Sequence, residues 1–159
     1  MTPIDASTFR HVLARFPSGV TVVTVRGPGG RDYGMTVSAF ASLSLVPPLV
    51  LVCIGDDATI AGAVAAAGQF AVNVLSEDQE ALARKFAEQD VDRFDGASIS
   101  RGETGLALLD GAAARLECRI VARHRGGDHT IIVGEVFGAS ALQDGRPLVY
   151  QRGEYRRLR

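Results

Sequence analysis

The sequence contains no tryptophan, and it has only two cysteines and three histidines among its 159 residues. Cys53 and Cys118 stand alone in strand-like segments without CxxC spacing, so neither a zinc site nor a disulfide is expected. We interpret both as small buried side chains. The longest apolar run, Leu49 to Ile54, is far too short to span a bilayer, and the first residues lack the apolar core of a signal peptide. We therefore expect a cytoplasmic protein with no membrane partner.

An excess of charge of either sign is also missing. Seventeen Lys and Arg residues oppose 18 Asp and Glu residues, which gives a formal net charge of -1. A nucleic acid or an anionic membrane would be attracted by a basic surface, and no basic run with interleaved aromatic residues occurs. Nucleic acid is therefore not an expected partner.

Motifs that carry chemistry by themselves are absent as well. The glycine-rich stretch at 27–30 links two predicted strands, and Asp32 stands where a dinucleotide-binding fingerprint needs its third glycine. We find no phosphate-binding P-loop, no zinc-protease motif and no nucleophile elbow, and no metal site is expected. Either the chain is a binding or structural module, or its chemistry belongs to a cofactor.

What the sequence does contain is the pattern of one mainly β domain with helices, over 1–159. Hydrophobic residues make up 47%, and 18 glycines provide turns. Helices are predicted at 5–16 with Asp5 or Ser7 as its cap, at 57–68 with Gly68 as its C-cap, and at 76–87 with Ser76 and Gln79 as a capping box. Strands are predicted at 19–25, 33–40, 49–54, 69–75, 114–124, 129–142 and 148–158, the last three as a meander, with a surface loop at 88–105. This order favours an antiparallel barrel with helices outside it.

The stretch "GMTVSAFASLSLVPPLVLV" from Gly34 to Val52 reads as two strands around Pro47 and Pro48. Its first half alternates, with Thr36 and Ser38 on one face and Met35, Val37 and Ala39 on the other. Its second half is apolar on both faces, as in a doubly buried strand. Hydroxyls that lead into such a strand either face water or form the polar rim of a pocket for a planar, phosphate-bearing heterocycle.

Four segments together resemble the flavin reductase-like family, in its short-chain type that serves two-component flavin monooxygenases. They are "RFPSGVTVVTV" (15–25), "YGMTVSAFASLSLVPPLVLVCI" (33–54), "FAVNVLSEDQEALARKFA" (70–87) and "GDHTIIVGEV" (127–136). The resemblance runs in order from about Phe9 to Tyr155. It implies a split β-barrel of Greek-key type that binds FMN or FAD, a homodimer, and reduction of the flavin by NADH or NADPH.

The resemblance also assigns roles to individual residues. It places Met35, Thr36, Val37, Ser38, Ala39, Ser42 and Leu43 beside the flavin ring and ribityl chain, Pro48 at the return turn, Cys53 near the ribityl side, Ser76, Arg84 and Lys85 at the phosphate, and Tyr150 over the pocket or in the dimer contact. Alternatively, Arg84 and Lys85 are only a solvated helix face on which Arg84 pairs with Glu80. His129 is placed at the open face of the flavin, where its imidazole would orient the nicotinamide; otherwise it is a surface residue.

The implied reaction is hydride transfer from the nicotinamide to flavin N5, after which reduced flavin serves a monooxygenase. The alternative is a flavin-binding module without enzymatic activity, for storage or redox sensing. The resemblance is compatible with FMN or FAD as the flavin and with NADH or NADPH as the reductant. The loop at 88–105 either closes over the adenine half of a dinucleotide or is simply mobile.

Overall fold

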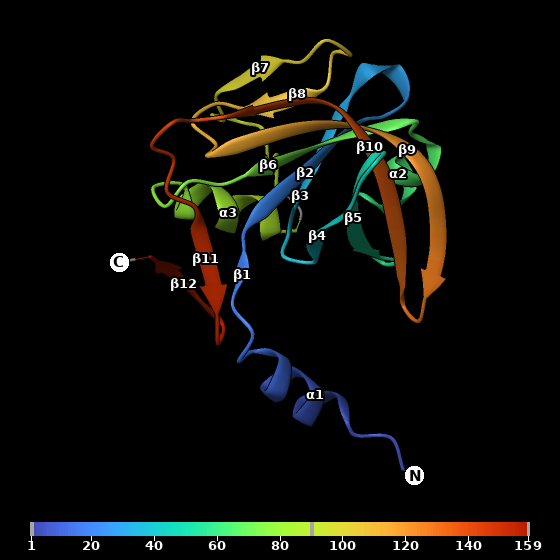
Figure 1. The fold of residues 1–159 in the computed structure, drawn as a ribbon, viewed down its shortest axis with the longest axis vertical. Coiled ribbons are helices and arrows are strands. Elements are labelled where there is room, and N and C mark those ends of the chain that lie inside the picture. The colour runs from blue at the N-terminus through green and yellow to red at the C-terminus, as the bar shows by residue number, and fades with distance from the viewer. Residues whose placement is uncertain (1, 90, 159) are drawn as a thin grey trace.

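A computed structural model describes residues 2–89 and 91–158, so Asp90 in the predicted loop lies outside the described residues. The chain is mainly β, with short helices, and α1 projects away from the body (Figure 1). The helices are α1 Ala6–Leu13, α2 Ala61–Ala66 and α3 Glu80–Ala87, with a 3-10 turn at Pro28–Gly30. The strands are β1 Ser18–Gly19, β2 Thr21–Arg26, β3 Asp32–Val37, β4 Phe40–Leu45, β5 Pro48–Gly55, β6 Gln69–Val74, β7 Ile99–Arg101, β8 Ala107–Leu109, β9 Ala114–Gly126, β10 His129–Ala141, β11 Leu148–Gln151 and β12 Glu154–Arg157.

The main sheet has seven antiparallel strands in the order β3-β2-β6-β9-β10-β5-β4. Its two outermost strands, β3 and β4, follow each other in the chain and are joined only by Ser38 and Ala39. A flat sheet of this width would hold its edges about 29 Å apart, which two residues cannot bridge. The sheet must therefore curve strongly (Figure 1). The closed split barrel remains a prediction.

The prediction of two strands between Gly34 and Val52 is wrong, because the chain forms three. The strand predicted at 33–40 breaks at Ser38 and Ala39, where the chain leaves one edge of the sheet and enters the other. Neither residue is a glycine or proline, so the sequence carries no sign of this break. The turn at Pro47 is confirmed, since β4 and β5 pair there with Leu45 opposite Pro48.

Strand β5 was expected to be buried on both faces, and this expectation is also wrong. Its side chains alternate between buried positions, at Val50, Val52 and Ile54, and half-buried positions that include Leu51 and Cys53. The buried face packs inside the curved sheet, while no second layer of the described chain covers the other face. An apolar strand face is thereby left open to a ligand or to another chain.

The C-terminal meander is confirmed only in its first half. Strands β9 and β10 form a long hairpin, as predicted. Strand β11 then leaves the main sheet and pairs with β1 and β12 in a separate sheet, with Ser18 opposite Tyr150. The segment predicted as one strand at 148–158 is a second hairpin, because Arg152 and Gly153 both adopt left-handed backbone angles, with φ of 54° and 80°.

The predicted surface loop at 88–105 contains strand β7, which pairs with β8. A buried asparagine, Asn73, ties β8 to the main sheet. Its Nδ2 donates to the carbonyl of Val22 at 3.1 Å, and its Oδ1 accepts from the backbone N–H of Leu109 at 2.8 Å. Both strands are only three residues long, too short for a periodic sequence signal.

The helices are shorter than predicted, although their positions are right. Asp5 caps α1, because its Oδ1 accepts from two backbone N–H groups. The C-cap of α2 is Ala67 rather than Gly68. Helix α3 begins at Glu80 rather than Ser76, and only half of the predicted capping box forms, since Gln79 Oε1 accepts from the Ser76 N–H at 3.0 Å. A single turn, closed by the bond from the Gln79 N–H to the carbonyl of Ser76, therefore precedes α3.

The apolar residues form two cores. One lies inside the curved sheet and contains Phe70 and Ile54, and the other lies between the sheet and α3 and contains Phe86 and Leu75. The apolar stripe predicted on the first helix belongs to neither core.

None of the described helices combines the length and the apolar character that crossing a membrane requires.

Candidate functional site

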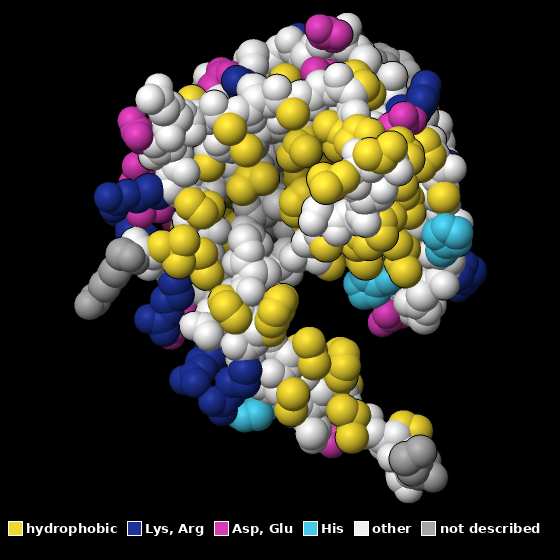
Figure 2. Space-filling model, viewed as in Figure 1, with side chains coloured by type: hydrophobic (Ala, Val, Ile, Leu, Met, Phe, Trp, Pro, Cys, Tyr) yellow, Lys and Arg dark blue, Asp and Glu magenta, His cyan; other side chains and the backbone are white. Residues whose placement is uncertain are grey.

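A wide groove lies where α1, the edge of the main sheet and the turn after β11 meet. Its volume is about 910 Å³. Figure 2 shows hydrophobic side chains gathered on the body beside the projecting arm of α1. The groove is lined by Phe9, Arg10, Leu13, Ala14, Phe16, Pro17, Ser18, Gly19, Ser38, Ala39, Phe40, Ala41, Leu51, Cys53, Tyr150, Gln151, Arg152 and Gly153. No carboxylate occurs among these described lining residues, so the charges in the groove are cationic.

Four of the predicted site residues meet at this groove, namely Ser38, Ala39, Cys53 and Tyr150. Ser38 and Ala39 form the crossing between the two sheet edges, and the backbone N–H of Cys53 donates to the carbonyl of Ala39 at 3.0 Å. Cys53 also belongs to the open face of β5, next to Leu51. The groove thus combines backbone polar groups with an uncovered apolar floor.

The remaining residues of β3 point elsewhere, although their alternation is confirmed. Val37 is buried in the core inside the sheet, and Met35 packs against it. Thr36 lies on the opposite face, where its hydroxyl donates to the carbonyl of Ala83 in α3 at 2.6 Å. That hydroxyl therefore gives its proton to the carbonyl of Ala83 in α3, and only its oxygen, as an acceptor, and the backbone of Thr36 are left for a cofactor. The flavin contacts of Met35, Thr36 and Val37 remain predictions.

Three further predicted residues lie on the exposed β4–β5 hairpin. Ser42, Leu43 and Pro48 do not line the groove, and Leu43 is 50% exposed. Their roles beside the flavin also remain predictions.

The cations of α3 have partners within the chain. Arg84 pairs with Glu80 at 2.7 Å, as the alternative interpretation of this helix face predicted, and its guanidinium carbon lies 4.9 Å from the centre of the Tyr155 ring. Tyr155 in turn lies 5.3 Å from Tyr150, and burial raises the pKa of its phenol. Lys85 donates to the backbone carbonyl of Asp95. The contact of Arg84 or Lys85 with a flavin phosphate stays a prediction.

Ser76 lies in a separate cavity of about 530 Å³, which it shares with Arg146 and Leu142. Since α3 begins four residues later, the amides of Ser76 do not form the helix N-terminus that was expected to hold a phosphate. Its role also stays a prediction.

His129 is the first residue of β10 and lies opposite Gly55, at the end of β5. Its Nδ1 is 2.7 Å from a carboxylate oxygen of Asp128, and this hydrogen bond holds the pKa of Asp128 below its usual range. A carboxylate only accepts, so Nδ1 carries the proton and Nε2 is left for another partner. His129 is half-exposed and does not line the groove of the single chain, and its catalytic role remains a prediction.

The two cysteines differ in environment. Cys118 is fully buried, and burial raises the pKa of its thiol to about 12. Cys53 is half-buried on the groove.

The sequence interpretation missed Leu51 and Arg10 as groove residues, whereas Arg152, which also lines the groove, belongs to the C-terminal segment that was expected to cover the pocket or pack the dimer. Strict alternation along β5 would have identified Leu51 beside Cys53. Arg10 and Arg152 come from segments that are far apart in the sequence and are brought together by the pairing of β1 with β11 and by the bond of the Arg152 N–H to the carbonyl of Ala14, which no local pattern reveals.

The fold and the groove indicate the class of protein. A mainly β protein with a wide, largely apolar groove suits the binding of a planar ligand, which the groove would contact through the ligand's faces and through backbone groups. The comparison with protein families agrees with this class. The chain belongs to the flavin reductase family, since the model of the flavin reductase like domain matches residues 13–159.

Similar proteins are known in several bacteria. An NADH-dependent FAD reductase of Streptomyces globisporus is 44% identical over 161 residues, covering 98% of this chain and 87% of the relative. The reductase subunit HsaB of a flavin-dependent monooxygenase from Rhodococcus jostii is 38% identical over 152 residues, covering 96% and 77%. Among solved structures, the Streptomyces globisporus C-1027 NADH:FAD oxidoreductase SgcE6, in complex with NAD and FAD fragments, superposes with a TM-score of 0.92 at 42% identity, covering 100% of this chain and 98% of that one.

Proposed function

We propose that this protein is an NADH-dependent flavin reductase that supplies reduced flavin to a monooxygenase. The observation that carries the proposal is the groove in which the open apolar face of β5 meets the crossing at Ser38 and Ala39. Relatives named as an NADH-dependent FAD reductase and as a monooxygenase reductase subunit support both the reductant and the acceptor. When bound, the flavin supplies an electron-accepting ring to which NADH transfers a hydride.

The residues of the groove fit such a ligand. Leu51 and Cys53 offer an apolar surface to a ring face, and the backbone at Ser38 and Ala39 offers donors and acceptors to its edge. Arg10 adds positive charge for a phosphate. The chain's contribution is orientation and exclusion of water, because no side chain needs to act as an acid or base in a stacked hydride transfer.

His129 is the residue that we assign to the nicotinamide. Its Nδ1–H donates to Asp128, which leaves Nε2, on the side of Gly55, as the acceptor of the neutral ring. From that position it would accept a hydrogen bond from the carboxamide and orient the nicotinamide toward the flavin.

The proposal includes a homodimer built on a split barrel, in the cytoplasm. Helix α1 and the turn that follows it stand away from the body and carry four apolar side chains that the single chain leaves largely exposed, Phe9 at 53%, Val12 at 55%, Leu13 at 48% and Phe16 at 75%. A stripe at this spacing is a helix face that packs against another element. A second copy of the chain is the partner that we propose for it.

The test is the loss of absorbance at 340 nm when purified protein is mixed with NADH or NADPH and with FMN, FAD or riboflavin. We expect turnover that saturates with flavin and prefers NADH. His129→Asn should lower kcat by up to about tenfold, since the one hydrogen bond that orients the carboxamide contributes about 0.5–1.5 kcal/mol. Flavin binding without turnover in any combination would instead identify a storage or sensing module.

A further inference from the structure

A small cavity, which we call the α2 cavity, lies between α2 and the ends of β5, β9 and β10. Its volume is about 170 Å³. It is lined by Ile54, Asp56, Ala61, Val64, Ala65, Arg123, Thr130 and Ile132, none of which lines the groove. None of the residues predicted for the flavin or the nicotinamide belongs to this set, so the proposed function does not explain the cavity.

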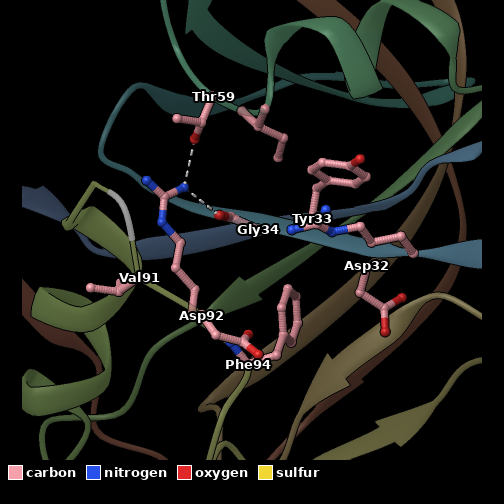
Figure 3. Close-up of a pocket in the computed structure, with 10 residues that line it drawn as sticks. Asp32, Tyr33, Gly34, Thr59, Val91, Asp92 and Phe94 are labelled. Atoms are coloured by element: carbon pink, nitrogen blue, oxygen red, sulfur yellow. Dashed lines mark hydrogen bonds between the residues drawn. The ribbon is translucent and has the colours of Figure 1, made fainter.

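Helix α2, which forms one wall of the cavity, is fastened at both of its ends. At its start, Arg93 Nη1 donates to the hydroxyl of Thr59 at 2.9 Å and to the carbonyl of Gly34 in β3 at 2.8 Å (Figure 3). At its end, Arg123 Nη2 in β9 donates to the carbonyl of Ala67, the C-cap of α2, at 2.6 Å. Because these bonds tie the helix to the segment 91–94 and to two strands, the wall is in place before a ligand arrives.

The floor of the cavity is apolar. Ile54 in β5, Ile132 in β10 and Val64 in α2 are each at most 3% exposed and belong to the core inside the curved sheet. Ala61 and Ala65 lie one helical turn apart on α2, and their short side chains leave the space that forms the cavity. A ligand with an apolar body would therefore displace water from an apolar surface.

The rim of the cavity offers an acceptor and a donor. The acceptor is the carboxylate of Asp56. Its Oδ1 accepts from the hydroxyl of Thr130 at 3.0 Å and its Oδ2 lies 3.3 Å from Arg125 Nη2, so each oxygen can accept one more hydrogen bond. The donor is Arg123, whose Nη2 bonds to α2 and whose Nε and Nη1 have no partner in the described part of the chain.

The volume of the cavity limits the ligand to a single ring. An apolar cavity of about 150 Å³ holds one benzene molecule, whereas pockets for larger ligands span roughly 300–1,000 Å³. The three-ring system of a flavin and a nicotinamide nucleotide are therefore too large for the α2 cavity.

The rim selects the polar group on that ring. A carboxylate on the ligand would meet the charge of Asp56, and an ammonium group would meet the charge of Arg123, and like charges repel. A hydroxyl donates to Asp56 and accepts from Arg123, so it satisfies both groups. A phenol is neutral at pH 7, since its pKa is about 10, and it carries this hydroxyl on a rigid ring that loses little freedom on binding.

We propose that the α2 cavity is a binding site for a single-ring phenol, with the ring between α2 and the apolar floor and the hydroxyl between Asp56 and Arg123. The cavity shares no lining residue with the groove, so the inference does not rest on the proposed function. Flavin and the phenol would bind to the protein at the same time.

Calorimetric titration of phenol into the full-length protein, with and without saturating FMN, tests the inference. We expect a Kd on the order of 0.1–1 mM, because so small a ligand gains little contact area. The same Kd in the presence of FMN would support a site outside the groove. Loss of phenol binding when FMN is present would place the phenol in the groove and overturn the inference.

Ala65→Leu tests the space in the cavity. Ala65 is exposed and lines the cavity, so leucine adds bulk there without entering a core and keeps a residue that favours helix. We expect the Kd for phenol to rise at least about tenfold. Ala66→Leu is the matched control, because Ala66 is exposed on the same helix and does not line the cavity. It should leave the Kd unchanged, and equal phenol affinity in Ala65→Leu and Ala66→Leu would overturn the inference.

Asp56→Asn tests the hydrogen bond at the rim. Asparagine keeps an acceptor for Thr130 but removes the charge, and hydrogen bonds to charged acceptors are about twice as strong as neutral ones. The Kd for phenol should rise about three- to tenfold, while the Kd for toluene, which has the ring without the hydroxyl, should not change. An equal loss for both ligands would contradict the assignment to a phenol.

The Kd for FMN should stay unchanged in all three variants, which would show that the fold is intact. The binding measurements use no NADH, so they are independent of turnover. A protein that binds phenol as expected but never oxidises NADH would refute the reductase and leave the α2 site in place.

Discussion

Replacing Phe16 by alanine should weaken self-association of this chain. An aromatic side chain buries about 150–250 Å² on full burial, and Phe16 is 75% exposed in the single chain. A partner could therefore cover about 110–190 Å² of it, worth up to ~3–5 kcal/mol at 25 cal/mol per Å². Truncations at interfaces recover only part of such an upper limit. We expect a loss of about 1–1.5 kcal/mol per side chain, and because each two-fold dimer contains two copies of Phe16, the dimer Kd should rise roughly 30- to 150-fold.

Sedimentation velocity over a wide range of protein concentration measures this change directly. The wild type should sediment as a dimer at concentrations at which Phe16→Ala is mostly monomeric. Leu142→Ala serves as the control, because Leu142 is 51% exposed but lies in the cavity around Ser76, away from α1. A wild type that is monomeric throughout, or a Phe16→Ala dimer as tight as the wild type, would refute the assignment of the α1 stripe to a second copy.

Two further predictions concern the groove and the core. Iodoacetamide at pH 8 should modify Cys53 and not Cys118, because only the thiolate reacts and burial raises the pKa of the Cys118 thiol to about 12. Added FMN should slow the reaction at Cys53, which lines the groove. Mass spectrometry of the alkylated peptides measures both rates, and faster modification of Cys118 would contradict the reasoning. Asn73→Ala should lower the free energy of unfolding by about 2–4 kcal/mol in urea titration, because it removes two buried hydrogen bonds, to the carbonyl of Val22 and from the N–H of Leu109. A change below about 1 kcal/mol would show that β8 is held by other contacts.

Those parts of the fold that depend on neighbours in the sequence could be predicted. Asp5 caps α1 because its carboxylate reaches N–H groups two and three residues away, and the turn at 27–31 returns β2 into β3. The break at Ser38 and Ala39 could not be predicted, because it is imposed by the pairing of β4 with β5 on the far edge of the sheet. Long-range pairing likewise removes β11 from the expected meander.

The candidate site, like the fold, could be predicted only in part from the sequence. The resemblance to the family led to Ser38, Ala39, Cys53 and Tyr150, which the fold brings to one groove. The bond of the Thr36 hydroxyl to the carbonyl of Ala83 at 2.6 Å could not be predicted, because the sequence does not reveal that α3 lies against this face of β3. A pattern of alternation gives the face of a strand, but it does not say which neighbour occupies that face.

The short strand β1 has a consequence for how the protein is made. Because β1 pairs with β11, the residues at 18–19 cannot form their strand pairing until the residues at 149–150 have been synthesised. The groove likewise takes residues from Phe9 to Gly153. During translation the complete groove therefore cannot form until the β11–β12 turn has been synthesised, and flavin can stabilise the complete groove only from that point on. Chains that stop before β11 would keep the strands of the seven-stranded sheet but lack the wall of the groove that residues 150–153 form.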